Sequence, residues 1–157
     1  MKKRYFSSPL DFVRVAGGVL RRSRALGDVY VRGRLGADDR ERIMVAVSRV
    51  NDCGGCTYVH ERWALRAGVS DEELRSMEIG DLAGLDARGR AAVIYATARA
   101  ETGFQGSPSP EALSACSELT PREVLAAEAV ARAMTLANMS VNTAESMRQR
   151  LHPSETL

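Results

Sequence analysis

Apolar residues recur along almost the whole chain at the three- and four-residue spacing that lines one face of an α-helix. One such stripe comprises Ile43, Met44, Val47 and Val50, and it stops at Asn51-Asp52. Between the breaks, the chain is rich in alanine, leucine, arginine and glutamate, which favour helices, and strand-like alternation is nearly absent. The pattern therefore predicts an all-α fold, most simply a helical bundle.

The helix starts are marked by residues whose side chains accept hydrogen bonds from the free N–H groups of a first turn. Four predicted helices have both ends marked: Pro9 to near Gly27, Asp38 to Val50, about Cys53 to Ala67, and Asp86 to near Gly103. Three more have a marked start, at Ser70, Ser109 and Thr120. Proline follows Ser8, Ser109 and Thr120, in the first helical position. Ser70 with Glu73, and Asp38 with Glu41, have the spacing of capping boxes.

The last predicted helix carries the run "EVLAAEAVARAMTLANMSVNTAESM". Its many alanines and methionines predict burial on more than one side. Asn138 and Asn142 lie four positions apart within it, so their amides need hydrogen-bond partners if they face the core. We expect them to serve packing rather than chemistry.

Length and charge fit one ordinary globular domain. The chain has 157 residues, 45% hydrophobic, with 22 basic and 20 acidic residues. The basic residues are dispersed except for "RRSR" at Arg21 to Arg24, which we interpret as a solvated helix end, so no nucleic-acid partner is expected. Asp11 and Arg14 interrupt the apolar run that an N-terminal signal peptide would need. No stretch approaches the roughly 20 apolar residues of a membrane span. We therefore expect a cytoplasmic protein without a membrane partner.

The stretch "DCGGCTYVHE" concentrates the candidate chemistry. In a reducing compartment, a close pair such as Cys53 and Cys56 is more often catalytic or metal-binding than structural. On one helix both thiols share a face with His60, whose side chain leans back toward Cys56 and could remove its proton. Cys53, however, would occupy the first turn, where the helix dipole also favours a thiolate. These two arguments leave the attacking thiol open.

Two alternatives compete with thiol chemistry. Cys53, Cys56 and His60 offer three soft ligands for zinc, but a closed site needs a fourth, and Cys116 and His152 lie far away without paired spacing. Cys116 is more simply a small core residue on an apolar helical stripe. The second alternative is a structural or binding protein that keeps the fold without activity.

The segment "ERIMVAVSRVNDCGGCTYVHERWALRAGVSDEEL", with Glu41 twelve positions before Cys53, resembles the alkylhydroperoxidase D-like branch of the carboxymuconolactone decarboxylase superfamily. The later "LANMSVNTA" is similar to that family's C-terminal helix. The resemblance covers roughly residues 35–151 and implies an all-α helical bundle of this type. Residues 1–34 would then be an additional N-terminal helical segment of a single domain spanning residues 1–157.

The resemblance also implies a thiol peroxidase. Cys56 would attack a hydroperoxide and become a sulfenic acid, and Cys53 would resolve it into a disulfide, the redox-active Cys53-Cys56 pair. Glu41 and His60 would relay protons, although a capping role with Asp38 explains Glu41 more simply from local sequence alone. No cofactor and no metal ion are implied.

The implied partners are a hydroperoxide substrate and a dithiol reductant, such as a lipoylated protein or a thioredoxin-like protein. Family members form homo-oligomers, often trimers or hexamers, with the redox site near subunit contacts. Gly55 departs from members that carry a histidine between the cysteines, which implies a weaker peroxidase or a different reductant. Superfamily members that decarboxylate lactones generally lack the cysteine pair, so its presence argues against that activity.

Overall fold

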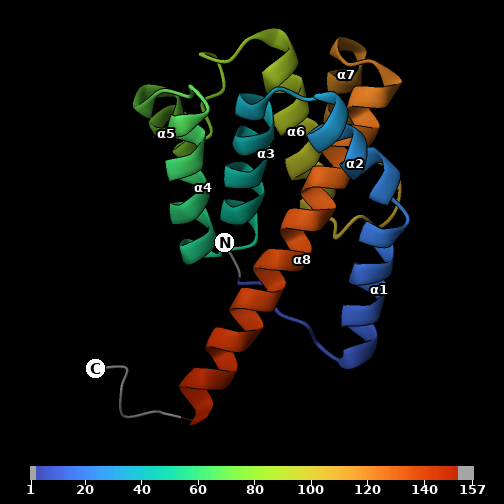
Figure 1. Ribbon diagram of the computed structural model, residues 1–157, viewed down its shortest axis with the longest axis vertical. Helices are drawn as coiled ribbons and strands as arrows, with labels where there is room; N and C mark the ends of the chain where they lie inside the picture. Colours follow the sequence, from blue (N-terminus) through green and yellow to red (C-terminus); the bar gives the residue numbers. More distant parts are fainter. Residues whose placement is uncertain (1–2, 152–157) are drawn as a thin grey trace.

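The computed structural model describes residues 3–151 and, over that range, contains eight α-helices, one short 3₁₀ helix and no strand (Figure 1). The all-α prediction is confirmed. The helices are α1 (Pro9–Leu20), α2 (Ser23–Arg32), α3 (Ala37–Val50), α4 (Gly54–Arg66), α5 (Asp71–Glu78), α6 (Ala87–Glu101), α7 (Pro110–Ala115) and α8 (Pro121–Leu151), with η1 (Cys116–Glu118) between α7 and α8.

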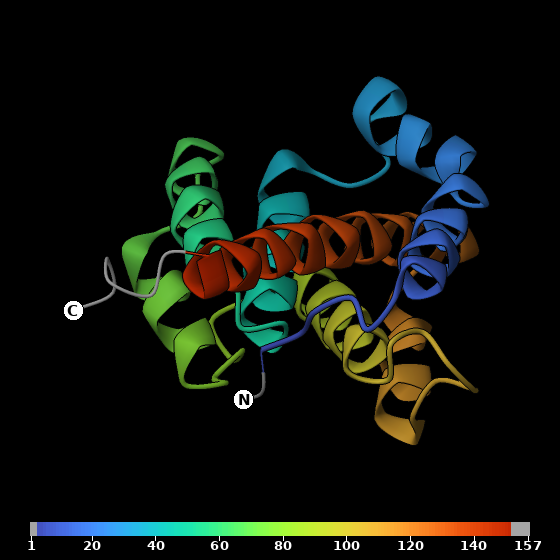
Figure 2. The ribbon, with the colours of Figure 1, turned by 90° about the horizontal axis from the view of Figure 1, so that it is seen from below.

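Three helices, α3, α6 and α8, pack against one another at the centre, and the others cover them. Seen from below, α8 crosses the middle of the molecule (Figure 2). Fully buried alanines on two of these helices, including Ala92, Ala96 and Ala127, let their backbones approach closely, while Ile43 and Val47 of α3 fill the space between them. This close packing fixes α3, and α4 lies directly against α3.

Most predicted helix starts are confirmed by their hydrogen bonds. The side chains of Ser8, Ser70, Asp86, Ser109 and Thr120 each accept from a backbone N–H three residues later. The capping box of Asp38 with Glu41 is wrong, because α3 begins after Gly36 without a side-chain cap. Asp38 instead lies in the first turn of α3, and Glu41 is buried with another partner.

The single helix predicted from Pro9 to near Gly27 is also wrong, because the chain breaks at Arg21-Arg22 and Gly27 lies inside α2. Both α1 and α2 contact α8. The break changes the chain direction so that two short helices can cover α8 at different places (Figure 1). Apolar spacing carries no information about such a change of direction.

Among the described helices, α8 alone is long and apolar enough to cross a membrane by length and composition. The buried core helix of a globular protein meets the same two criteria, so α8 does not contradict the expectation of no membrane span. More than half of its most apolar window, 56%, is buried inside the protein. The apolar composition of α8 is thus largely used in the core, as predicted from its burial on several sides.

Candidate functional site

The two cysteines lie where α3 turns into α4. They are joined in a disulfide, with Cα atoms 5.3 Å apart. Cys56 is in the first turn of α4, but Cys53 is its N-cap, with a non-helical backbone (φ −107°, ψ 86°). The prediction of one helical face therefore applies to Cys56 and His60 and not to Cys53. Cys53 is 1% exposed and Cys56 9% exposed, so Cys56 is the more accessible sulfur.

The predicted carboxylate and imidazole meet directly. Nδ1 of His60 lies 2.8 Å from Oε2 of Glu41, although the residues are 19 positions apart. The contact forms because α4 packs back along α3 after the turn at the cysteines. Glu41 is only 3% exposed, and its other oxygen accepts a hydrogen bond from Nε of Arg40 at 3.2 Å. Both oxygens are therefore held, and the carboxylate fixes the orientation of the imidazole.

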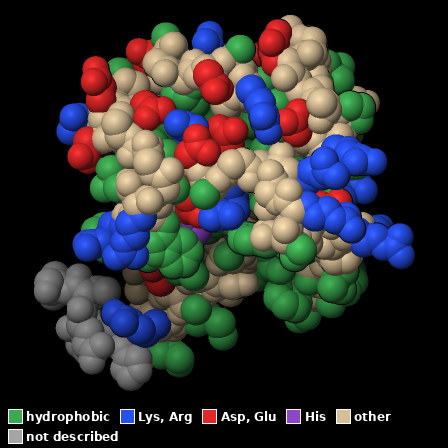
Figure 3. Space-filling view, turned by 45° about the horizontal axis from the view of Figure 1, so that its top comes forward, with side chains coloured by type: hydrophobic (Ala, Val, Ile, Leu, Met, Phe, Trp, Pro, Cys, Tyr) green, Lys and Arg blue, Asp and Glu red, His purple; other side chains and the backbone are tan. Residues whose placement is uncertain are grey.

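Aromatic and basic side chains that the sequence did not single out surround this pair. Trp63, half exposed, packs edge-to-face on His60 with ring centroids 5.0 Å apart. Arg40 also lies over the ring of Tyr30 on α2, 4.9 Å from its centroid. The imidazole, the only one in the described chain, is visible as a small purple area among hydrophobic and basic side chains (Figure 3). The one-turn spacing of His60 and Trp63 was the available signal for the aromatic contact.

A shallow groove adjoins the pair. It has a volume of about 290 Å³ and is lined by Glu41, Trp63, Arg40 and Arg66 together with Ala37 and Ala67. The buried carboxylate thus borders a depression at the surface. Of the four predicted site residues, only Glu41 lines this groove.

A layer of buried amides supports the cysteine turn from behind. Asn51, the last residue before the turn, donates to Oδ1 of Asn138 at 3.1 Å and to Oγ1 of Thr135 at 3.2 Å. Asn138 donates to Oγ of Ser48, and Asn142 donates to the backbone oxygen of Asn51. The packing role expected for Asn138 and Asn142 is confirmed. These bonds tie α8 to the end of α3, two residues before Cys53.

Asp52 makes the turn itself. Its φ of 51° lies in the left-handed region, which aspartate tolerates better than most residues. The N–H of Asp52 donates to the carbonyl of Arg49, and that of Cys53 donates to the carbonyl of Ser48. This sharp turn brings Cys53 back to the start of α4, within disulfide reach of Cys56.

The zinc alternative finds little support in the geometry. Within residues 3–151, no three side chains among His, Cys, Asp and Glu are grouped to hold a metal ion. Cys53 and Cys56 are bonded to each other, and Cys116 packs separately against the core, where burial raises the pKa of its thiol. His152, the other distant candidate, lies outside the described residues.

The four predicted residues thus occupy two packed helices and their connecting turn. A carboxylate–imidazole pair on α3 and α4 can accept and return a proton, and the disulfide on the same turn can accept two electrons. The Cys53-Cys56 pair forms locally at the start of α4, and the Glu41-His60 pair is brought together by the packing of α4 on α3.

Comparison with known proteins adds one match. A model of the "Carboxymuconolactone decarboxylase family" matches residues 20–98, half of the chain, including Glu41, Cys53, Cys56 and His60. The match begins before residue 35, where the resemblance begins, and ends before α8. No curated protein and no solved structure matches the chain. With half of its length matched and an all-α fold around the paired motif, the chain belongs to the carboxymuconolactone decarboxylase family.

Proposed function

We propose that this protein is a thiol-dependent peroxidase that reduces hydroperoxides through the Cys53-Cys56 couple. The observation that carries the proposal is the 2.8 Å contact between His60 and Glu41, on the two helices that meet at the cysteine turn. A buried carboxylate that orients an imidazole is a common arrangement for moving a proton to or from a thiol.

In the proposed reaction, the Cys56 thiolate attacks one oxygen of the hydroperoxide, the O–O bond breaks, and the alkoxide leaves as an alcohol after receiving a proton. Cys56 is then a sulfenic acid. The Cys53 thiolate attacks this sulfur, the S–S bond forms, and hydroxide leaves as water. One hydroperoxide and two thiols thus give one alcohol, one water and one disulfide. His60 and Glu41 would take the thiol proton and return it to the leaving oxygen.

Accessibility supports Cys56 as the attacking thiol. Its side chain is more exposed than that of Cys53, and it shares α4 with His60. Gly54 and Gly55, between the cysteines, are both exposed. An external dithiol, from a lipoylated or thioredoxin-like protein, could therefore approach the disulfide over these glycines and return two electrons and two protons. The cytoplasm would supply such a reductant.

Exposed apolar side chains support a homo-oligomer, which we propose to be a trimer or hexamer. On α4, Tyr58, Val59, Trp63 and Leu65 are each more than 40% exposed, beside the proposed relay. Met147 and Leu151 are exposed at the end of α8, which extends beyond the packed helices (Figure 1). Large apolar side chains gathered on one surface favour a protein contact. Light scattering should give a multiple of the 17.1 kDa chain mass.

A peroxide-consumption assay tests the proposed activity. Purified protein is mixed with hydrogen peroxide or an alkyl hydroperoxide and with a panel of reductants that includes dihydrolipoamide and thioredoxin. We expect catalytic turnover with at least one reductant, and none for Cys56→Ser. An absence of turnover with every reductant, while the protein remains folded, would contradict the proposal.

A further inference from the structure

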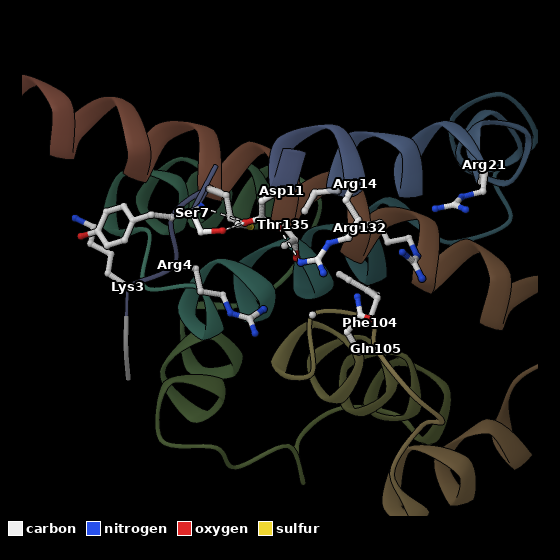
Figure 4. Close-up of a pocket in the computed structure, with 14 residues that line it drawn as sticks. Lys3, Arg4, Ser7, Asp11, Arg14, Arg21, Phe104, Gln105, Arg132 and Thr135 are labelled. Atoms are coloured by element: carbon white, nitrogen blue, oxygen red, sulfur yellow. Dashed lines mark hydrogen bonds and ion pairs between the residues drawn. The ribbon is translucent and has the colours of Figure 1, made fainter. Parts of the chain in front are cut away.

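A large cavity lies away from the cysteine turn. It has a volume of about 940 Å³, is partly open to solvent, and is lined by the N-terminal segment, α1, the loop after α6, and α8 (Figure 4). None of Glu41, Cys53, Cys56 and His60 lines it. Its labelled side chains extend from Lys3 at one end to Arg21 at the other, so the cavity is elongated (Figure 4). This volume and shape suit a small organic molecule.

The cavity lining carries an excess of positive charge. Its charged residues are Lys3, Arg4, Arg14, Arg21 and Arg132, with Asp11 as the only carboxylate. Asp11 pairs with Arg14, and Lys3 pairs with a glutamate outside the lining. Among the described residues, Arg4 and Arg21 pair with no carboxylate and donate instead to backbone carbonyls. An anion entering the cavity would therefore meet uncompensated cations.

Arg132 of α8 is the most firmly positioned of these cations. Its Nε donates to Glu128 at 2.8 Å, and its guanidinium stacks on Phe104, 4.4 Å from the ring centroid. Glu128 also pairs with Arg22 and accepts from Tyr95, so one carboxylate serves two arginines. Within the described chain, the two terminal nitrogens of Arg132 make no hydrogen bond to the protein. They form a preoriented pair of donors suited to two oxygens of one anion.

A glycine makes room for this guanidinium. Gly18 is buried in α1, and a Cβ atom added there would lie 2.8 Å from Nη1 of Arg132. At the neighbouring Gly17, an added Cβ atom would meet nothing within 4 Å. The helix therefore accommodates Arg132 specifically at position 18.

Part of the cavity lining is apolar, beside polar side chains that include Ser7, Gln105 and Thr135. Val15, Phe104 and Met139 line it from α1, the loop and α8. Phe104 has a φ of 62°, a left-handed conformation that is costly for a large side chain, and its N–H is held by the carbonyl of Arg99 at 2.8 Å. The loop thus keeps an aromatic ring against Arg132 at the expense of backbone strain.

We propose that this cavity binds an organic anion that carries an apolar chain, with its carboxylate or phosphate head at Arg132 and its chain along Phe104, Val15 and Met139. The arginine donors recognise the two oxygens common to both head groups, and the apolar walls bury the chain. Such a ligand site is separate from the proposed peroxidase site, and its binding is measured without any redox reaction.

Isothermal titration calorimetry of the full chain tests this site with four probes: decanoate, decyl phosphate, 1-decanol and acetate. We expect one decanoate or decyl phosphate per chain, and the tighter of the two identifies the preferred head group. Decanol and acetate, which each lack one half of the ligand, should bind at least about ten-fold more weakly. If neither decyl anion binds at millimolar concentration, or if acetate binds as tightly as decanoate, the proposal is overturned.

Two variants with one matched control place the ligand. Gly18→Ala should displace the guanidinium and weaken decyl-anion binding about ten-fold, whereas Gly17→Ala, in the same helix, should not change it. Arg132→Gln removes the two donors and should weaken binding by at least as much. Circular dichroism would check that each variant is folded. Equal affinity of Arg132→Gln and the wild type would overturn the assignment, whatever Gly18→Ala shows.

Discussion

Nδ1 of His60 lies 2.8 Å from the carboxylate of Glu41, on a neighbouring helix, and Arg40 holds the other oxygen of that carboxylate. The pair is almost completely enclosed, since the side chains of His60 and Glu41 are 11% and 5% exposed. An enclosed pair keeps its geometry and is poorly screened by water.

Replacing Glu41 with glutamine should lower kcat/KM for peroxide by about 100-fold, because the carboxylate no longer stabilises a protonated imidazole. Glutamine has nearly the same shape, so the fold should persist. The measurement is peroxide consumption over a range of pH, with Asp38→Asn as the control, since Asp38 is a more exposed carboxylate of the same helix. A loss of similar size in Asp38→Asn would assign the effect to helix charge instead.

The two cysteines should give different products with peroxide. In Cys53→Ser, Cys56 should accumulate as a sulfenic acid, because no second thiol resolves it. Mass spectrometry after dimedone labelling would locate the adduct on Cys56, and Cys116→Ser would serve as the control with normal disulfide formation. The assigned roles would be reversed by an adduct on Cys53 in Cys56→Ser together with no adduct on Cys56 in Cys53→Ser.

Gly55 can accept a side chain. A Cβ atom added there would meet nothing within 4 Å, and its φ is outside the left-handed region. Gly55→His should therefore fold with a free energy of unfolding within about 1 kcal/mol of the wild type. If the missing histidine limits the relay, peroxide consumption should rise by about ten-fold. Gly54→His is the matched control, and equal rates in all three proteins would show that position 55 does not limit the reaction.

The amide layer should be important for stability. Asn138→Ala removes the acceptor of Asn51 and the donor to Ser48, all in the fully buried interior. We expect a loss of about 2–4 kcal/mol in the free energy of unfolding, measured by urea titration in the oxidised state. Ser140→Ala, on the exposed side of the same helix, should change it by less than about 0.5 kcal/mol.

Stability should depend on Glu128 at acidic pH. Burial would raise the pKa of Glu128, but hydrogen bonds from Arg132 and Tyr95 outweigh it and hold the pKa below its ordinary value. The unfolded chain therefore binds a proton more readily, so the stability that Glu128 contributes is present at neutral pH and is lost as pH falls through the lower folded pKa. Glu128→Gln should reduce stability at pH 7 and flatten its decline below about pH 5.

Thermal unfolding between pH 3 and 7 would measure this difference. The exposed Glu111→Gln is the control and should follow the wild type throughout. If Glu128→Gln unfolds at the same temperatures as the wild type across this pH range, the Glu128 carboxylate contributes nothing to stability through its pairing with Arg22.

Contacts between residues close in sequence made many helix starts and candidate site residues predictable. The starts at Ser8, Ser70, Asp86, Ser109 and Thr120 depend on contacts three residues apart, and such contacts are encoded within a single turn. The apolar composition of α8 likewise indicated its burial. The cysteine pair and His60 were recognised because they share one short stretch.

Other features depend on contacts between distant segments. Sequence spacing favoured a capping role for Glu41, but the packing of α3 against α4 buries it against His60. Packing between helices likewise determines three other features. These are the break at Arg21-Arg22, the non-helical backbone of Cys53, and the hydrogen bond between Asn138 and Asn51 before the cysteine turn. The sequence by itself thus determined the helices and the candidate residues, because these follow from short-range hydrogen bonding and periodicity. Only the tertiary structure decided which residues become partners, because burial and long-range packing select among locally equivalent arrangements.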